Sequence, residues 1–313
     1  MGIDIGAIST KGVIIDKYDN IIASAYLDTE GEPIKAVKRL IKMLRHEIDL
    51  DNYQIVSVGT TGRARKLIGA LLEANVIKNE ITAQAVGTIK LYPDVRTIID
   101  IGGEDAKIIL VHDGIVTDYG INTSCMAGEG NFLDMLFKQL NIDTEQIGKI
   151  AINSTNRVDI SAKCMIFAET DIIHKIQMGY KKEDILSGAC RMVAMNYLNG
   201  VGKGKKIQAP IIFNGGVSKN IMVVKYFEEL LGQKIIVNRN SRLMSAFGIA
   251  IMARESKKEK LFNFDIDADR LDTKLINCTK CSNNCEIMAI YKNDKMIDYW
   301  GNRCKHDVIL KNV

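Results

Sequence analysis

The sequence predicts an α/β protein of two related lobes, followed by a small cysteine-rich module. An apolar strand, a glycine turn and a returning strand open the chain and recur from Thr97 onward, which indicates an internal duplication. Runs with strand and helix periodicity alternate in both copies. Four of the seven cysteines lie beyond the second copy. We expect a first lobe over 1–95, a second lobe over 96–256 and the module over 261–313.

The composition excludes several classes of protein. An apolar fraction of 47% and a charged fraction of 26% are typical of a globular protein. The 42 basic and 38 acidic residues leave no basic block for nucleic acid. No apolar run reaches the ~18 residues of a membrane helix, and no signal peptide precedes the first motif. In such a chain an odd, clustered set of seven cysteines favours metal or cluster ligation over disulfides. We therefore expect a cytoplasmic protein that binds neither nucleic acid nor membranes.

The first lobe begins with a short apolar strand that ends in a glycine turn carrying hydroxyl groups and a lysine. A second strand returns from this turn, and a third follows the Asp19-Asn20 dipeptide. Apolar residues at helical spacing then predict an amphipathic helix, and a later buried strand runs into the polar turn 60–63. The expected strands are 12–15, 20–27 and 55–59, and the expected helices are 33–48 and 80–90.

The second lobe repeats this order. The strand from Thr97 ends in the Gly102-Gly103 turn, a strand returns, and Asp113-Gly114 starts the next hairpin. Strands and helices then alternate as far as Ala253, and the charged run 257–260 indicates a solvated linker to the module. The further strands expected are 115–120, 209–213 and 234–237, and the helices are 167–178, 183–198, one ending at 231, and 243–253.

The glycine turns of the two copies favour a phosphate-binding role. Their backbone N–H groups can donate to phosphate oxygens, and glycine permits the close approach. Asp4 and Asp100 end the strands before these turns, and two carboxylates there suit Mg²⁺. Thr10 and Lys11 are placed to contact phosphates, and 214–217 (Asn-Gly-Gly-Val) can let a nucleoside lie against the backbone. Each turn alone is more often a simple hairpin, but their combination in this order predicts a nucleotide site.

Two cysteines stand shortly before helical runs. Cys125 precedes 132–140, and Cys164 precedes 167–178. The N–H groups and dipole of a helix N-terminus favour a thiolate, or an anionic cluster bound to thiolates. Two such cysteines are half of a four-thiolate iron–sulfur site, and a second copy of the chain can supply the other half. The alternative is a pair of buried, inert cysteines.

The C-terminal module carries a second set of cysteines. Cys278, Cys281 and Cys285 lie close together in sequence, and Cys304 follows a β-hairpin. Four thiols in this order suit tetrahedral Zn²⁺ or an iron–sulfur cluster, and His306 is an alternative ligand. Zinc would make the module a metal-stabilised structural element or a docking site, whereas an iron–sulfur cluster would make it an entry point for electrons. The spacing does not decide between the two.

These motifs resemble those of a known superfamily. Asp4-Ile5-Gly6 with Ser9-Thr10-Lys11, then 100–103 and 214–217, resemble the acetate kinase/Hsp70/actin nucleotide-binding superfamily. The loops 125–133 and 164–169 are similar to those of activators of 2-hydroxyacyl-CoA dehydratases. That group also includes the ATPase subunits of benzoyl-CoA reductases and the reductase of double-cubane cluster proteins. The resemblance covers roughly Gly2 to Ala253.

The resemblance implies an actin-like ATPase fold of two duplicated ribonuclease H-like lobes. It implies ATP or ADP with Mg²⁺, held through Asp4 and Asp100, and a [4Fe–4S] cluster shared by Cys125 and Cys164 of both subunits of a homodimer. ATP hydrolysis would drive an electron from ferredoxin or flavodoxin into a partner iron–sulfur enzyme. Asp4, Asp100 and Glu104 would be the catalytic residues. The implied nucleotide-binding residues are Gly6, Ser9, Thr10, Lys11, Gly102, Gly103, Gly128, Glu129, Gly215, Gly216 and Val217.

Two departures from the family pattern bear on the site. Glu104 stands where the family often has glutamine, and an acid there can order the attacking water or act as a base. Ile249 follows Gly248 where a small residue is usual, which alters the expected adenine pocket. Two other functions stay open: a small-molecule kinase of the same fold, which needs a substrate-pocket base but no cysteine pair, and a nucleotide-gated, redox-sensing regulator.

Overall fold

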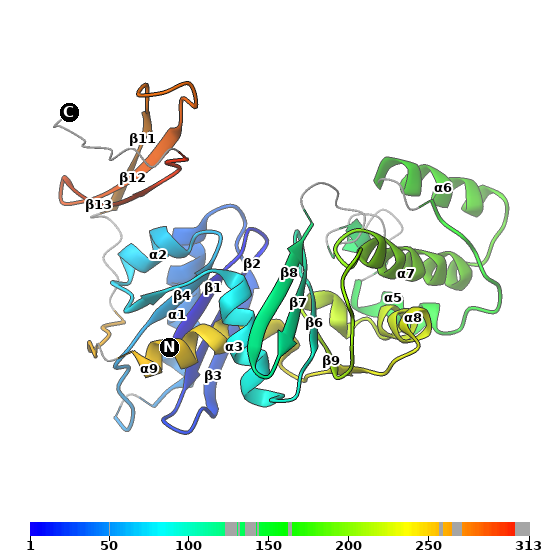
Figure 1. Cartoon of the computed structure of the whole chain (residues 1–313), viewed down its shortest axis with the longest axis horizontal. Coiled ribbons are helices and arrows are strands. Elements are labelled where there is room, and N and C mark those ends of the chain that lie inside the picture. Colours follow the sequence, from blue (N-terminus) through cyan, green and yellow to red (C-terminus); the bar gives the residue numbers. More distant parts are fainter. Residues whose placement is uncertain are drawn as a thin grey trace. The chain divides into compact units, whose positions relative to one another are not determined.

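The computed structural model describes residues 1–49, 51–122, 130, 132–134, 142, 144–161, 165–256, 259–264 and 271–303. The chain divides into two compact units, Met1–Asn79 with Ile249–Val313, and Glu80–Gly248 (Figure 1). The helix α9 (Met244–Glu255) crosses from the second unit into the first. The boundary predicted from the sequence falls instead between residues 95 and 96. The predicted lobes, 1–95 and 96–256, and the predicted module, 261–313, stay predictions.

The first unit contains a five-stranded sheet in the order β3-β2-β1-β4-β5. The first three strands form an antiparallel meander, and β4 and β5 add to β1 in parallel. Helix α1 begins with a proline in its first turn and buries five apolar residues against the sheet. A Cβ at Gly12 would lie 2.8 Å from Leu44, so glycine lets α1 lie close to β2. The elements are β1 (Gly2–Ile5), β2 (Ser9–Ile15), β3 (Ile21–Asp28), α1 (Pro33–Glu47), β4 (Gly59–Gly62), α2 (Arg65–Leu71) and β5 (Val76–Ile77).

One predicted strand of this unit is wrong in position. The apolar run 55–59 lies almost wholly outside the sheet, and β4 starts only at Gly59. Ile55 and Val58 still enter the core. The strand instead consists mainly of residues that the sequence analysis expected in a turn. Two of them, Thr60 and Thr61, are fully buried next to β1. Hydrophobic periodicity cannot identify a strand of this composition.

The second unit has a sheet of the same topology, in the order β10-β9-β6-β7-β8. Helices α5, α7 and α8 cover one face (Figure 1), where residues such as Ile99 and Phe213 join them in the core. Helix α3 covers the other face through Ala85, which packs with Ile98 and Ile212. A sheet buried on both faces explains why all five residues of β6 are buried.

The second unit confirms the predicted alternation of strands and helices, with boundaries displaced by one or two residues. Its elements are α3 (Glu80–Leu91), β6 (Thr97–Ile101), β7 (Ala106–His112), β8 (Ile115–Ile121), α5 (Thr144–Ala151), α6 (Met165–Gln177), α7 (Lys182–Asn199), β9 (Ile211–Asn214), the 3₁₀ helix η2 (Gly216–Lys219), α8 (Ile221–Leu231), β10 (Ile235–Val237) and the 3₁₀ helix η3 (Ser241–Leu243). The matching strand orders of the two units bear out the predicted internal duplication.

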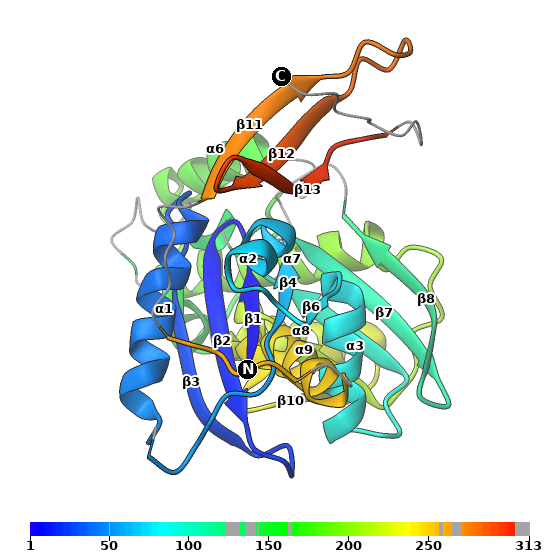
Figure 2. The same cartoon turned by 90° about the vertical axis from the view of Figure 1, so that its left-hand side faces the viewer.

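The cysteine-rich module is a three-stranded antiparallel sheet in the order β11-β12-β13 (Figure 2). The sequence predicted only the hairpin of β12 (Glu286–Lys292) and β13 (Lys295–Trp300), whereas β11 (Leu271–Asn277) adds a third strand. No helix in the described parts of the chain is long and apolar enough to span a bilayer.

Candidate functional site

The turn between β1 and β2 is closed by its own backbone and by a threonine from β3's end. Gly6 N–H donates to Ser9 O at 3.0 Å, and Thr29 Oγ1 donates to Gly6 O at 2.9 Å. Thr10 is fully buried, and its hydroxyl lies 2.8 Å from that of Thr29. These hydrogen bonds hold the turn in place. Lys11 is the third residue of β2, just beyond the turn.

Asp4 stands at the end of β1 and is only 4% exposed. Its Oδ2 atom accepts from Lys11 Nζ at 3.2 Å, whereas its buried Oδ1 atom has no hydrogen-bond partner among the described residues. Thr61 lies opposite Asp4 in the β1–β4 ladder, and its Oγ1 atom is likewise buried and unsatisfied among those residues. Buried oxygens without partners call for an explanation, and these are the ligand types of Mg²⁺ and of its bound waters. The residues therefore fit a hydrated magnesium ion.

The turn between β6 and β7 repeats this geometry in the second unit. Asp100 ends β6, and Gly102 N–H donates to Asp105 O at 2.9 Å. Gly130 N–H in turn donates to Gly102 O at 2.9 Å. Gly103 and the predicted catalytic residue Glu104 are half-buried in this turn.

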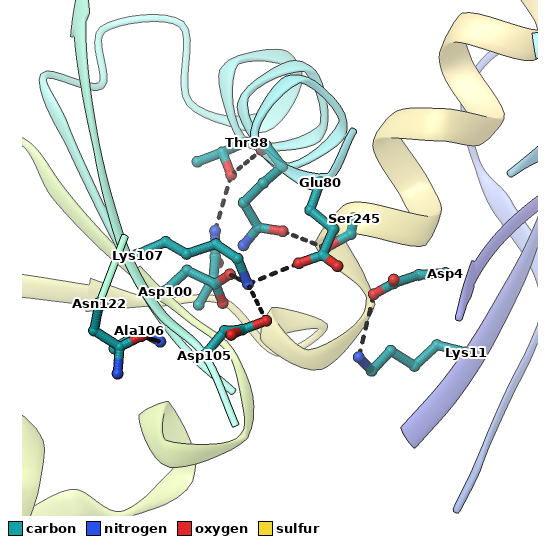
Figure 3. Close-up of polar contacts among 12 residues, drawn as sticks. Asp4, Lys11, Glu80, Thr88, Asp100, Asp105, Ala106, Lys107, Asn122 and Ser245 are labelled. Atoms are coloured by element: carbon teal, nitrogen blue, oxygen red, sulfur yellow. Dashed lines mark hydrogen bonds and ion pairs between the residues drawn. The ribbon is translucent and has the colours of Figure 1, made fainter. Parts of the chain in front are cut away.

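Lys107 on β7 lies close to three carboxylates (Figure 3). Its Nζ atom lies 2.7 Å from Glu80 Oε2 and 3.8 Å from both Asp100 Oδ2 and Asp105 Oδ2. Burial alone would lower the pKa of Lys107, but the charges of Asp100 and Glu80 outweigh it and raise the pKa well above its ordinary value. The lysine is therefore a permanent cation among acidic groups.

Sequence reasoning missed Lys107 and Glu80. The signal was available for the lysine, because Lys107 follows Asp100 at the spacing by which Lys11 follows Asp4. The structure makes the two pairs equivalent: Asp4 pairs with Lys11 in one ladder, and Asp100 with Lys107 in the other. No local pattern pointed to Glu80, which starts a helix elsewhere in the second unit.

The end of β9 provides a third polar feature of the second unit. Asn214 lies opposite Asp100, donates through Nδ2 to Thr88 Oγ1 at 2.9 Å, and has a buried Oδ1 atom with no partner in the described chain. Gly215 follows with φ +85°, and a Cβ there would lie 2.2 Å from Ile101 O. Gly216 instead faces open space, since a Cβ there would meet nothing within 4 Å. Val217 is buried in the core at the start of η2.

Each unit thus carries the same arrangement of acid, lysine, polar side chain and glycine. In the first unit Thr61 lies beside Asp4, and Gly62 has φ +93°. In the second unit Asn214 lies beside Asp100, and Gly215 has φ +85°. Each acid lies near the carboxyl end of a central strand of its own sheet, the end at which ligands commonly bind in α/β proteins.

The two predicted cluster cysteines, Cys125 and Cys164, lie outside the described residues, as do Gly128, Glu129 and Cys304. Helix α6 begins at Met165, directly after Cys164, and Phe132 and Leu133 are buried in the core of the second unit. Within the described ranges, no three or more His, Cys, Asp or Glu side chains gather closely enough to hold a metal ion.

Comparison with known proteins places the chain in a family. The model of the BadF/BadG/BcrA/BcrD ATPase family matches residues 1–253. The 2-hydroxyisocaproyl-CoA dehydratase activator of Clostridioides difficile is 33% identical over 260 residues, which cover 83% of this chain and 96% of the activator. The (R)-2-hydroxyglutaryl-CoA dehydratase activating ATPase of Acidaminococcus fermentans is 30% identical over 253 residues, 81% of this chain and 96% of the relative.

A solved structure agrees with these relatives. The activator of the 2-hydroxyisocaproyl-CoA dehydratase from Clostridium difficile, with bound ADPNP, superposes with a TM-score of 0.75 at 31% identity, covering 81% of this chain and 93% of the activator. The predicted fold class, with two duplicated lobes of the actin-like ATPase type, is confirmed. The chain belongs to the BadF/BadG/BcrA/BcrD ATPase family.

Proposed function

We propose that the protein is an ATP-hydrolysing, homodimeric activator that carries one [4Fe–4S] cluster and delivers low-potential electrons to a partner iron–sulfur enzyme. The observation that carries the proposal is the repeated acid–lysine turn, Asp4 with Lys11 and Asp100 with Lys107, in a chain of this ATPase family. The relatives named as dehydratase activators and the ADPNP-bound neighbour support the activator role and the nucleotide.

The nucleotide site would use both turns. Asp4 and Asp100 would hold Mg²⁺ through its waters, because the buried Asp4 Oδ1 atom lacks another partner among the described residues. Bound Mg²⁺ would supply positive charge to neutralise the transferred phosphoryl group. Lys11 would contact phosphate, and Glu104 would order the attacking water or accept its proton. The other nucleotide contacts would come from Gly6, Ser9, Thr10, Gly102, Gly103, Gly128, Glu129, Gly215, Gly216 and Val217.

The cluster would be held by Cys125 and Cys164 of two subunits. Helix α6 starts directly after Cys164, and a helix N-terminus stabilises the negative charge of a thiolate-bound cluster. A ferredoxin or flavodoxin would reduce the cluster, which supplies the one-electron chemistry when bound. ATP and ADP would favour different arrangements of the helices behind the two cysteines, so that hydrolysis and electron delivery are coupled.

The test of the nucleotide site is ATP hydrolysis by anaerobically purified protein with no small-molecule acceptor added. Asp4→Asn and Asp100→Asn should each lower the rate by about 100-fold or more, the usual loss when an electrostatic contributor is removed. Asp118→Asn, at an exposed carboxylate paired with Lys205, is the matched control and should keep the wild-type rate. Phosphorylation of an added sugar or carboxylate in place of free hydrolysis would identify a kinase and reject the proposal.

The test of the cluster is separate. Wild type should contain about four iron and four sulfide per dimer and have the native mass of two chains. Cys125→Ala and Cys164→Ala should each lose this iron, whereas Cys190→Ala, at a core thiol, should keep it. Unchanged iron in both variants would overturn the ligand assignment. An intact cluster that reduces no acceptor in the presence of ATP would favour a redox-sensing regulator.

A further inference from the structure

Helix α3 carries a row of polar side chains into the interior of the second unit. Glu80, Gln84 and Thr88, here called the α3 stripe, follow one another at intervals of four residues and so lie along one face of the helix. Gln84 is 1% exposed, and Thr88 is fully buried. Buried polar groups need hydrogen-bond partners, and each member of the stripe has a partner on a different element (Figure 3).

The first member of the α3 stripe reaches the acid at the end of β6 through a lysine. Glu80 Oε2 lies 2.7 Å from Lys107 Nζ, and the same ammonium group lies 3.8 Å from Asp100 Oδ2. One cation thus joins the start of the helix to the carboxylate of the proposed nucleotide turn. A shift of α3 would move the lysine and change the charge next to Asp100.

The last member of the stripe fixes the orientation of an amide. A threonine hydroxyl carries one proton, and Thr88 Oγ1 donates it to Gln84 O at 2.8 Å. The hydroxyl oxygen is then left to accept, and Asn214 Nδ2 donates to it at 2.9 Å. Only the NH₂ end of the amide can donate to a hydroxyl that has already given its proton. Asn214 therefore keeps Oδ1, which has no partner among the described residues, as an acceptor.

The middle member of the stripe ties α3 to the start of α9. Gln84 Oε1 accepts from Ser245 Oγ at 2.7 Å, and Ser245 is the second residue of α9. The two helices lie backbone against backbone at this crossing, because a Cβ on Gly248 would collide with Ala83 O. This close contact holds α3 in place, so that its two outer polar residues can hold their partners at the same time.

We propose that the α3 stripe positions two side chains of the nucleotide site, an inference that rests on the proposed function. Asn214 lies opposite Asp100 in the β6–β9 ladder, so the stripe keeps a carboxylate and an amide oxygen side by side at the end of the sheet. Glu80 acts on Asp100 through the lysine, and Thr88 keeps the amide oxygen of Asn214 available. This oxygen accepts a hydrogen bond from a hydroxyl group or a bound water of the nucleotide complex.

The first experiment is steady-state ATP hydrolysis by variants of the full-length chain. Thr88→Val replaces the hydroxyl group with a methyl group and frees the Asn214 amide to turn. Its kcat should fall about 10-fold or more, with a smaller change in KM, because a misplaced group costs rate more than binding. Thr88→Ser, which keeps the hydroxyl, should restore most of the rate. Glu80→Leu, which releases Lys107, should lower kcat too, and Glu80→Gln, which can still accept from the lysine, should lower it less.

Thr97→Val is the matched control for the loss of a buried hydroxyl group. Thr97 is fully buried in the same unit, donates to Gln208 O at 2.9 Å and accepts from Gln208 N–H at 3.0 Å, away from the α3 stripe. The two valine variants should lose similar thermal stability, but Thr97→Val should keep kcat within about twofold, since it loses only structural hydrogen bonds. Equal losses of kcat in the two variants would reduce Thr88 to a structural role and overturn the inference.

Proton exchange at the Asn214 side chain tests the amide orientation without any hydrolysis. In ¹⁵N NMR spectra of the full chain, the side-chain resonances that disappear in Asn214→Ala identify this amide. Its protons should exchange slowly with heavy water in wild type and in Thr97→Val, and about 5-fold faster or more in Thr88→Val. Fast exchange in wild type would overturn the inference. Absence of ATP hydrolysis by wild type would instead reject the proposed function, and the exchange rates would then decide whether Thr88 fixes the amide.

Discussion

Lys107 and Glu80 form an ion pair of 2.7 Å that joins β7 to the first residue of α3 (Figure 3). The lysine side chain is 9% exposed, and Asp100 and Asp105 approach it at 3.8 Å. Removal of the cation would take away the positive charge that these three carboxylates share. We therefore treat Lys107 as the residue that positions Asp100.

Lys107→Met should lower the free energy of unfolding by about 3–5 kcal/mol, the usual cost of breaking a buried ion pair from one side. Lys205→Met is the matched control, because Lys205 pairs with the exposed Asp118 at the same 2.7 Å and should cost about 1 kcal/mol or less. Urea denaturation followed by circular dichroism measures both. Equal losses in the two variants would contradict the role given to Lys107.

The pH dependence of the Lys107 effect follows from its raised pKa. A group whose pKa is higher in the folded state stabilises fully below its unfolded value of 10.5 and loses this effect only as pH rises through the folded value. The difference in unfolding free energy between wild type and Lys107→Met should therefore stay level from pH 7 to 9. A decline over this interval would mean that the folded-state pKa of Lys107 lies below its ordinary value, the direction that burial alone would give.

Gly215 and Gly216 are neighbours with opposite constraints. Gly215→Ala should destabilise the second unit by at least about 2 kcal/mol, because φ +85° with ψ 174° is a region almost restricted to glycine and its Cβ would collide with Ile101 O. Gly216→Ala should leave thermal stability unchanged, since its Cβ meets nothing within 4 Å. If Gly216 lies against a nucleoside, the same variant should weaken ADP binding in calorimetry. Unchanged ADP affinity would remove Gly216 from the nucleotide site.

Asp184, at the start of α7, anchors the loop that follows α5. Its Oδ1 atom accepts from Ser154 Oγ at 2.8 Å and from the N–H groups of Thr155 and Asn156 at 2.9 and 3.0 Å. Burial alone would raise the pKa of Asp184, but the hydrogen bonds from Asn156 and its neighbours lower it to about 2. Asp184→Asn should cost about 2 kcal/mol at pH 7, because buried donors lose a charged acceptor.

This cost should depend on pH in a defined direction. A lowered carboxyl pKa stabilises the fold above the ordinary value of 3.8 and ceases to do so as pH falls through about 2. The difference between wild type and Asp184→Asn should therefore be constant from pH 7 to 5 and shrink below pH 4. Asp159→Asn, at a carboxylate whose side chain is 71% exposed, should show no comparable loss. A difference that grows on acidification would refute this account.

Cys190 should be inert in the folded protein. The thiol is fully buried on α7, burial raises its pKa to about 12, and Asn220 Nδ2 donates to its sulfur at 3.5 Å. Wild type and Cys190→Ala should take up equal amounts of iodoacetamide under native conditions and differ by one equivalent in urea. Mass spectrometry of the labelled peptides checks this. Native labelling at Cys190 would contradict the complete burial of this thiol on α7.

The sequence by itself determined the local chemistry of this protein. The turns after Asp4 and Asp100 were predictable because glycine and short polar residues specify a hairpin within a few positions. Helices such as α1 were predictable because one apolar face repeats every turn. The duplication followed from the recurrence of one pattern, and the second unit confirms it.

Only the tertiary structure decided which distant residues meet. Thr61 reaches Asp4, and Asn214 reaches Asp100, through parallel strand pairing, which places residues far apart in the chain side by side. The position of β4 escaped prediction because its buried residues are threonines, whose hydroxyls hide the apolar period. Glu80 joins Lys107 because the packing of α3 on the sheet brings a helix start to a strand, and local sequence carries no record of that contact.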